Sequence, residues 1–132
     1  MADKIELEIV TPEGQAFSGS VEGVTIPAST GYIGVLPGHT PLATELKIGV
    51  ISYRADGREN RLFCAWGFAE ILGDRVSILA DRIEKPGDID VEAARADKAR
   101  AESILDAKAE DADFQEALDL LASANSRLEI AG

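Results

Sequence analysis

The feature that most constrains this chain is a two-residue period near its start. Charged and apolar side chains alternate along residues 4–9. Successive side chains of a strand point to opposite faces, so this pattern predicts a β-strand with one face in water and one in a core. Short runs rich in Val, Ile and Leu recur at residues 21–26, 49–54, 59–63, 69–72 and 75–79. Strands this short are not stable singly, so they must form two layers over a shared core.

Turn residues separate these runs at the spacing of a sandwich or barrel. Asp56-Gly57 and Gly73-Asp74 each stand between two runs. Such pairs accept the positive φ angles of tight turns, so we expect a hairpin at each. Residues 11–14 end the first strand, and Pro27 is expected to end the second.

The pattern becomes helical after Pro86-Gly87. Residues 91–108 are rich in Ala, Arg, Lys and Glu, which are good helix formers. Asp88 or Asp90 can cap this helix. Its apolar stripe consists mostly of small side chains, namely Ala94, Ala101, Ile104 and Leu105.

A short acidic loop precedes a second predicted helix. Asp113 is expected to start it, and Glu116 completes a capping box. A seam then recurs at spacings of four and three, through Phe114, Leu118, Leu121, Asn125 and Leu128. So narrow a seam suits one neighbouring helix, and the short loop predicts an antiparallel hairpin. The predicted fold class is α+β, with an N-terminal antiparallel β-sandwich at residues 1–86 and a C-terminal two-helix antiparallel hairpin at residues 87–132.

Charge excludes several classes of partner. The net charge is −11, which disfavours nucleic acid and anionic lipid because like charges repel. Residues 1–85 carry 8 Lys and Arg against 12 Asp and Glu, whereas residues 86–132 carry 5 against 12. No apolar run approaches the roughly 20 residues of a membrane helix, and no signal peptide is evident. We therefore expect no direct membrane insertion; any association with a membrane goes through a partner.

Catalytic and metal chemistry are not expected. Cys64 is the only cysteine and lies in an apolar run, so we interpret it as a buried hydrophobe. His39 is the only histidine, which excludes a metal site of the His/Cys type. No nucleophile-elbow motif surrounds any serine, and no loop has the Lys and Ser or Thr of a phosphate-binding loop.

The unusual segment is residues 31–42, which combine three glycines and two prolines with apolar residues. Pro37-Gly38 suits a type II turn, which would present His39 beside a rigid loop. Two interpretations stand: a corner of the sandwich, or a shaped protein-contact loop that loses little entropy on binding.

In this order, the residues resemble the ε-subunit family of F-type ATP synthases. Three elements carry the resemblance: Phe17-Ser18-Gly19 with Val21-Glu22, the segment from Gly31 to Leu42, and Gly67-Phe68-Ala69-Glu70 followed by Val76, Leu79, Ala80 and Asp81. The second is the most specific, and together with the Ala- and Arg-rich hairpin the match covers nearly the whole chain.

The resemblance implies a non-catalytic rotor part. The family's sandwich binds the γ subunit and rests on the polar loops of the membrane c-ring, linking proton flow to ATP synthesis. By similarity, the c-ring contact is expected around Tyr32, Ile33, Gly38 and His39. Some relatives carry an acid where this chain has Tyr32. Without a targeting segment, the chain is expected to be bacterial and peripheral, on the cytoplasmic side of the inner membrane; a plastid-encoded chain is the alternative.

The hairpin carries a second implication. In many relatives it extends along γ and blocks ATP hydrolysis, with basic residues of the second helix meeting an acidic loop of the catalytic β subunit. Here the second helix offers only Arg127, against Asp113, Glu116, Asp119 and Glu129. Like charge across an interface costs affinity, so we expect the inhibitory state to be weak.

No cofactor is expected; a weak regulatory ATP is the alternative that the resemblance leaves open. Residues 89–96 are similar to the family's ATP motif but place two extra residues before Arg95. On a helix, two residues turn a side chain by about 200°. Asp90 and Arg95 are therefore either nucleotide ligands or a capping Asp and a solvated Arg.

Two other classes remain. A stand-alone β-sandwich adaptor would explain the loop and the hairpin but not their shared order. A small sandwich hydrolase would need a buried Ser or Asp bonded to His39.

Overall fold

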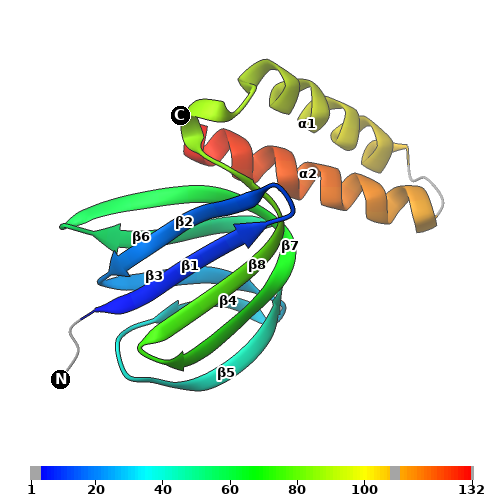
Figure 1. Ribbon diagram of the computed structural model, residues 1–132. Coiled ribbons are helices and arrows are strands. Elements are labelled where there is room, and N and C mark those ends of the chain that lie inside the picture. The colour runs from blue at the N-terminus through cyan, green and yellow to red at the C-terminus, as the bar shows by residue number, and fades with distance from the viewer. Residues whose placement is uncertain (1–3, 108–110, 132) are drawn as a thin grey trace.

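The computed structural model describes residues 4–107 and 111–131. Within them lie eight strands, a 3₁₀ turn and two helices (Figure 1). The strands are β1 Ile5–Thr11, β2 Gly14–Val21, β3 Gly23–Ala28, β4 Gly31–Val35, β5 His39–Leu46, β6 Gly49–Ala55, β7 Arg58–Gly73 and β8 Arg75–Glu84. They are followed by η1 Pro86–Asp88, α1 Val91–Asp106 and α2 Asp111–Ala131.

The strands form a two-layer sandwich, which confirms the predicted fold class. One layer contains β4, β3, β6 and the first half of β7, and the other contains the second half of β7 with β5, β8, β1 and β2. The long strand β7 joins the layers: it pairs with β6 up to Cys64 and with β5 from Gly67. Trp66, between them, has φ 56°. The described pairs are antiparallel except β1 with β8, which are parallel. The parallel pair was not predicted from the sequence, because the alternation of side chains determines which face of a strand is buried but not the direction of the strand beside it.

Both predicted hairpin turns are confirmed. Asp56 and Gly57 have φ 53° and 74°, the positive pair that a type I′ turn requires. Gly73 has φ 61° at the turn between β7 and β8. Gly38 has φ 83°, and His39 N donates to Leu36 O at 3.1 Å, as expected for a type II turn at residues 36–39.

One strand end differs from the prediction. β3 does not stop at Pro27 but continues to Ala28, with Pro27 paired opposite Tyr32. The carbonyl of Pro27 accepts a hydrogen bond from Lys47 N at 2.8 Å. The strand continues because the group that proline retains, its carbonyl, makes the bond at this position.

The core confirms the alternation from which the strands were predicted. Ile5, Leu7 and Ile9 of β1 are buried, and their charged neighbours are exposed. Other large side chains of this core are Val21, Ile26, Val35, Leu46, Ile51, Ile71, Val76 and Ile78. Burying each Val, Leu or Ile side chain contributes about 1.5–3 kcal/mol, so β-branched and leucine side chains supply most of the stability in a chain poor in aromatics.

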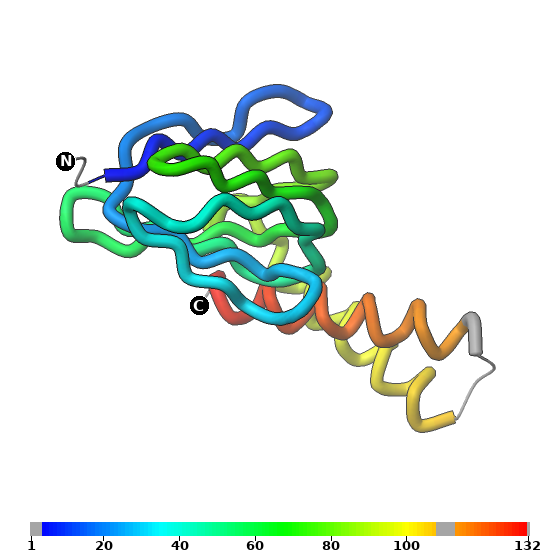
Figure 2. The backbone as a smooth tube through the Cα atoms, turned by 90° about the horizontal axis from the view of Figure 1, so that it is seen from below, coloured from blue at the N-terminus to red at the C-terminus, as the bar shows by residue number. Residues whose placement is uncertain are grey.

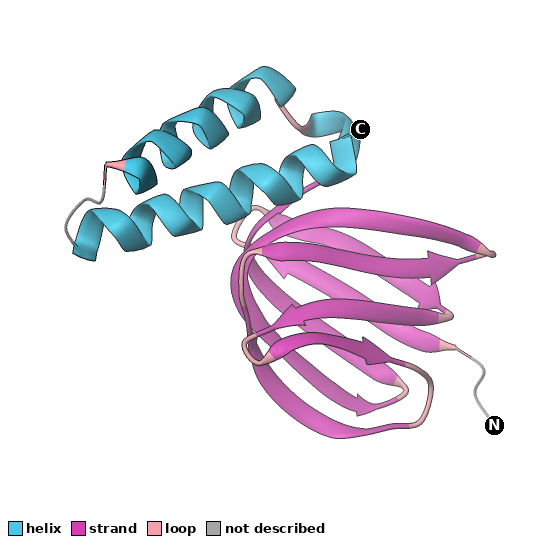
Figure 3. Cartoon of the chain, turned by 180° about the vertical axis from the view of Figure 1, so that it is seen from behind, coloured by secondary structure: helices cyan, strands magenta, loops and turns pink. Residues whose placement is uncertain are grey.

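The two helices form the predicted antiparallel hairpin (Figure 3). Asp90 caps α1, its side chain accepting from Ala93 N at 3.0 Å. Ala94 and Ala101 of α1 and Ala117 and Ala124 of α2 are fully buried. Because these side chains are small, the two helices can pack closely. The alanines therefore mark the faces along which α1 and α2 contact each other.

Two details of the second helix differ from the prediction. The helix begins at Asp111, so Asp113 lies in its first turn, where a carboxylate still favours the helix dipole. Phe114 and Leu118 of the predicted seam are 42% and 39% exposed, because the alanines on a neighbouring face pack against α1 instead. The predicted acidic loop includes residues 108–110, which lie outside the described residues.

The C-terminal end of α2 packs on the sandwich, whereas the other end of the hairpin projects away from it (Figure 2). Ile130 joins a small second core with Val50, Phe63 and Ile89. Val50 and Phe63 are paired across β6 and β7 and face outward from the sandwich. The helices therefore cover one end of an outer face of the first layer.

Candidate protein-interaction site

The turn at residues 36–39 is held by the neighbouring turn between β7 and β8. Gly38 N donates to the Asp74 carboxylate at 2.9 Å, and the Asp74 carbonyl accepts from Glu6 N at 2.7 Å. Three segments distant in sequence thus meet at the end of the sandwich away from the helices. The turn predicted from Pro37 and Gly38 is therefore a corner of the sandwich that hydrogen bonds hold in place.

Tyr32 lies on the outer face of the first layer and is 60% exposed. Its hydroxyl accepts a hydrogen bond from Val50 N at 3.0 Å. A Cβ on Gly49 would lie 2.7 Å from Pro27 Cβ, so only glycine fits beneath the tyrosine. The ring is therefore fixed in place while most of its surface remains available to a partner.

The four residues predicted for a c-ring contact do not form one cluster. Tyr32 is near the start of β4, whereas Gly38 and His39 lie beyond its other end. Ile33 is half-buried and packs against the main core, so it positions β4 from inside. The surface offered to a partner here comes from Tyr32 and from the corner at residues 36–39.

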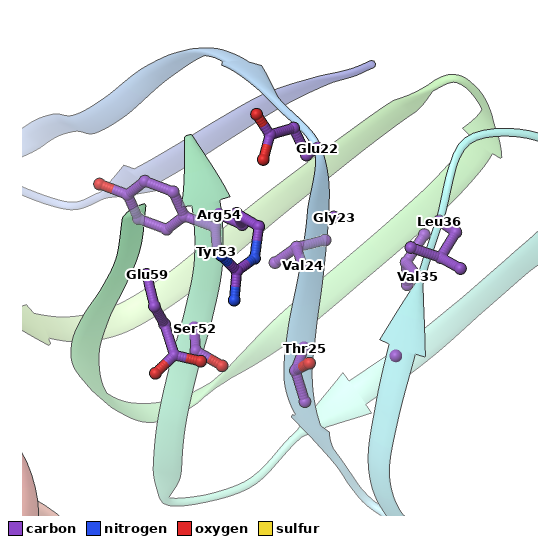
Figure 4. Close-up of a pocket in the computed structure, with 11 residues that line it drawn as sticks. Glu22, Gly23, Val24, Thr25, Val35, Leu36, Ser52, Tyr53, Arg54 and Glu59 are labelled. Atoms are coloured by element: carbon purple, nitrogen blue, oxygen red, sulfur yellow. The ribbon is translucent and has the colours of Figure 1, made fainter. Parts of the chain in front are cut away.

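A hollow lies between these two places (Figure 4). Its volume is about 400 Å³. Small residues of β3, β4 and β6 face outward along it, namely Gly23, Thr25, Gly34 and Ser52. Glu22, Arg54 and Glu59 supply charge at its edge, and Leu36, 67% exposed, stands on the side of β4. Because the side chains along it are small, the hollow has room for a loop of another protein.

The outer face of the second layer is different in character. Phe68 and Leu79 are directly paired across β7 and β8 and are 45% and 60% exposed. Leu72, two strand repeats from Phe68, is 52% exposed. We call Phe68, Leu72 and Leu79 the outer apolar face. The outward side of an antiparallel sheet is normally polar, so an apolar group here indicates a contact with another protein.

Acidic residues lie beside Phe68 on the outer apolar face, whereas Arg75 is paired with Leu72 at its end. Glu45 is paired with Phe68, and Glu70 lies between Phe68 and Leu72 on β7. A partner with an apolar centre and basic edges would complement it. These residues were not predicted from the sequence to lie in a contact. Their sequence signal is that apolar residues occupy the outward as well as the inward positions of β7 and β8.

Asp90 and Arg95, the nucleotide candidates, have local partners. The Asp90 carboxylate caps α1, and Arg95 pairs with Glu92 at 3.0 Å. Both residues are exposed on the first turns of α1. The geometry corresponds to the alternative of a capping Asp and a solvated Arg.

The remaining reactive side chains do not assemble a reaction centre among the described residues. Burial raises the pKa of the Cys64 thiol to about 12, and the charge of Asp81 adds to the effect. A ring nitrogen of His39 lies 2.6 Å from the carbonyl oxygen of Thr40, its chain neighbour. The hydrolase alternative required a buried Ser or Asp hydrogen-bonded to His39, and the contact found here is a backbone carbonyl. In the described ranges, no helix is long and apolar enough to cross a membrane.

Comparisons with known proteins agree with this architecture. Residues 4–86 match the family described as ATP synthase, Delta/Epsilon chain, beta-sandwich domain. The ATP synthase epsilon chain of Koribacter versatilis is 51% identical over 105 residues, which cover 80% of this chain and 74% of the relative. The ATP synthase epsilon chain of Geobacter sp. (strain M21) is 40% identical over 133 residues, covering 100% of this chain and 96% of the relative.

A solved structure shares the fold over the whole length. In the cryo-EM structure of Euglena gracilis mitochondrial ATP synthase (OSCP/F1/c-ring), one chain matches with a TM-score of 0.85 and 21% identity, covering 99% of this chain and 82% of that one. With the family match over the sandwich and relatives aligned along the full length, the chain belongs to the ATP synthase epsilon chain family.

Proposed function

We propose that this chain is the ε subunit of the central stalk of an F-type ATP synthase. Without making or breaking bonds itself, it links the c-ring to γ and so couples proton flow to ATP synthesis at the cytoplasmic face of a bacterial inner membrane. One observation carries the proposal beyond family membership: the two outer faces of the sandwich each offer a surface, and the two differ in chemistry. A close-packed core between the faces resists shear and can transmit torque.

The outer apolar face suits γ. Phe68, Leu72 and Leu79 are large, exposed and held on paired strands, so little entropy is lost when they are covered. A contact that persists through rotation needs such apolar anchors, since permanent interfaces are more hydrophobic than transient ones. The acidic edge at Glu45 and Glu70 would favour a basic edge on γ.

The face that carries Tyr32 and the hollow suits the c-ring. Its small side chains and charged edge would accommodate polar loops, with Tyr32 on one side and the corner at Gly38 and His39 on the other. The c-ring contact inferred from the family thus consists of two places separated by the hollow, with Ile33 supporting β4 from within.

Co-purification separates this proposal from the stand-alone adaptor. A rotor subunit should retain γ at near-equal amounts, whereas an unrelated adaptor should not. Loss of γ from the purified complex, or full coupling of proton flow to ATP production in an enzyme that lacks this chain, would contradict the proposal.

Substitutions then assign the faces. Phe68→Ser should weaken γ binding by about tenfold or more, as expected for loss of an interface anchor. Phe114→Ser removes an equally exposed phenylalanine from the hairpin and serves as the matched control. Tyr32→Ala should leave γ binding unchanged and reduce retention of the γ–ε complex on c-ring membranes. Equal effects of Phe68→Ser and Phe114→Ser on γ would refute the assignment of the outer apolar face.

A further inference from the structure

Arg127 is a buried cation at the junction of the sandwich and the hairpin. The residue is 9% exposed, although it lies one turn from the end of α2. Its Nε and Nη2 atoms donate to the two carboxylate oxygens of Glu84 at 2.9 and 2.8 Å. Such a bidentate pair is short, directional and stronger than a neutral hydrogen bond.

Two further groups surround the same guanidinium. Its central carbon lies 4.9 Å from the centre of the Phe63 ring, and its Nη1 atom lies 3.9 Å from a carboxylate oxygen of Asp97. Glu84 ends β8, Phe63 belongs to β7 and Asp97 to α1. One side chain of α2 therefore contacts the sandwich twice and the other helix once.

The ion pair and the apolar seat of the hairpin are adjacent. Ile130 follows Arg127 by three residues, so the two lie on one face of α2. Ile130 packs on Val50 and Phe63, and Phe63 also meets the Arg127 guanidinium. Lifting the hairpin from the sandwich would expose the apolar seat and separate the pair in the same movement.

We propose that Arg127 and Glu84 form a latch that holds the hairpin docked on the sandwich, with Asp97 keeping α1 in the same unit. Arg127 is also the only Lys or Arg in residues 111–132. While the latch is closed, α2 has no free cation for an acidic partner. Opening would release that cation and break both of its hydrogen bonds to Glu84, which would keep only Arg82 of its own strand, 2.8 Å away, so the latch favours the docked state.

The latch can be tested on the isolated full-length chain. Val50, 6% exposed beneath Ile130, is replaced by Cys in a Cys64→Ala background, and the rate of its reaction with a thiol reagent reports undocking. Arg127→Met should increase that rate by about tenfold or more, because it removes two hydrogen bonds between charged groups that hold the docked state. Arg127→Lys keeps the charge but cannot form the bidentate pair, so its labelling rate should lie between those of the wild type and Arg127→Met.

The control is a second ion pair across the same junction. Arg61 of β7 and Glu129 of α2 lie 3.7 Å apart, but their side chains are 40% and 61% exposed. Arg61→Gln should change the labelling rate by less than about twofold, as expected for an exposed pair. Glu84→Gln should act like Arg127→Met, and the double variant should open no more than the stronger single variant, because both remove the same interaction.

Two results would overturn the latch: equal rates for Arg127→Met and Arg61→Gln, or fully multiplicative effects of Arg127→Met and Glu84→Gln. Circular dichroism checks that each variant is folded, and if Arg127→Met is not, Arg127→Lys and Glu84→Gln decide the question. The role of the freed cation rests on the proposed rotor function, but the labelling needs neither γ nor the c-ring. The latch and the rotor proposal therefore fail independently.

Discussion

The Asp74 carboxylate accepts the backbone N–H of Gly38 at 2.9 Å, so a turn between β7 and β8 holds the turn that presents His39. The two residues are 36 positions apart in the chain. The corner of the most distinctive sequence segment is thus supported by the turn of the neighbouring strands β7 and β8, and its shape depends on a side chain outside the segment.

Replacing Asp74 should loosen this corner without unfolding the protein. Asp74→Ala removes the acceptor of the Gly38 N–H and should lower the free energy of unfolding by about 1 kcal/mol. Hydrogen exchange at the Gly38 amide should become several-fold faster by NMR. Asp74→Asn retains an acceptor oxygen and should restore most of the protection; equal exchange in wild type and Asp74→Ala would contradict the prediction.

Gly67 should tolerate no side chain. A Cβ at this position would overlap the carbonyl oxygen of Leu79 and lie 2.9 Å from Ala80 Cα, both backbone atoms of β8. Gly67→Ala should therefore lower the free energy of unfolding by about 3 kcal/mol or more in urea denaturation. Gly34→Ala is the matched control, since a Cβ there meets nothing within 4 Å, and it should cost far less. Similar losses for the two would show that the overlap is relieved elsewhere.

Cys64 should make the protein alkali-sensitive. Burial and Asp81 raise the pKa of its thiol from 9.0 to about 12, so the unfolded chain loses this proton at lower pH than the folded one. The contribution of the Cys64 thiol to the free energy of unfolding is fully present below pH 9. It declines by about 1.4 kcal/mol per pH unit between pH 9 and pH 12. Cys64→Ala should narrow the difference in unfolding free energy between pH 8 and pH 11. An unchanged difference would be inconsistent with a buried thiol pKa near 12.

Removing the hairpin should barely alter ATP hydrolysis. The described end of α2 offers Arg127 as a cation, which is paired with Glu84, alongside several carboxylates. An acidic helix is poorly suited to an acidic loop of the catalytic β subunit. Deletion of residues 88–132 should leave hydrolysis by the reconstituted enzyme within about twofold, compared at equal occupancy with the full chain. A several-fold rise would establish the hairpin as an inhibitor.

ATP should bind no more tightly than the millimolar range. Asp90 is engaged with the first turn of α1, and Arg95 pairs with Glu92 on the exposed side of the same turn. Neither is available without breaking a local interaction. Calorimetric titration of the full-length chain checks this prediction, with Arg95→Gln as a comparison. Binding at micromolar ATP that is lost in Arg95→Gln would instead make both residues nucleotide ligands.

The sequence by itself determined the local structure and the fold class. Alternation over residues 4–9, the Asp56-Gly57 and Gly73-Asp74 turns and the Ala-rich helix after Asp90 each depend on interactions within a few residues, and each is present. Side-chain period and turn chemistry are local properties, which is why they can be read without the fold.

Only the tertiary structure decided the contacts between distant segments. In the structure β1 is parallel to β8, and Arg127 is hydrogen-bonded to Glu84. The helices pack through their alanines and not through the predicted seam of Phe114 and Leu118. It also separated Tyr32 from His39 and aligned Phe68 with Leu79 on one face. These outcomes depend on which surfaces meet when the core closes, and the energy of such contacts depends on the burial and position of groups far apart in the chain.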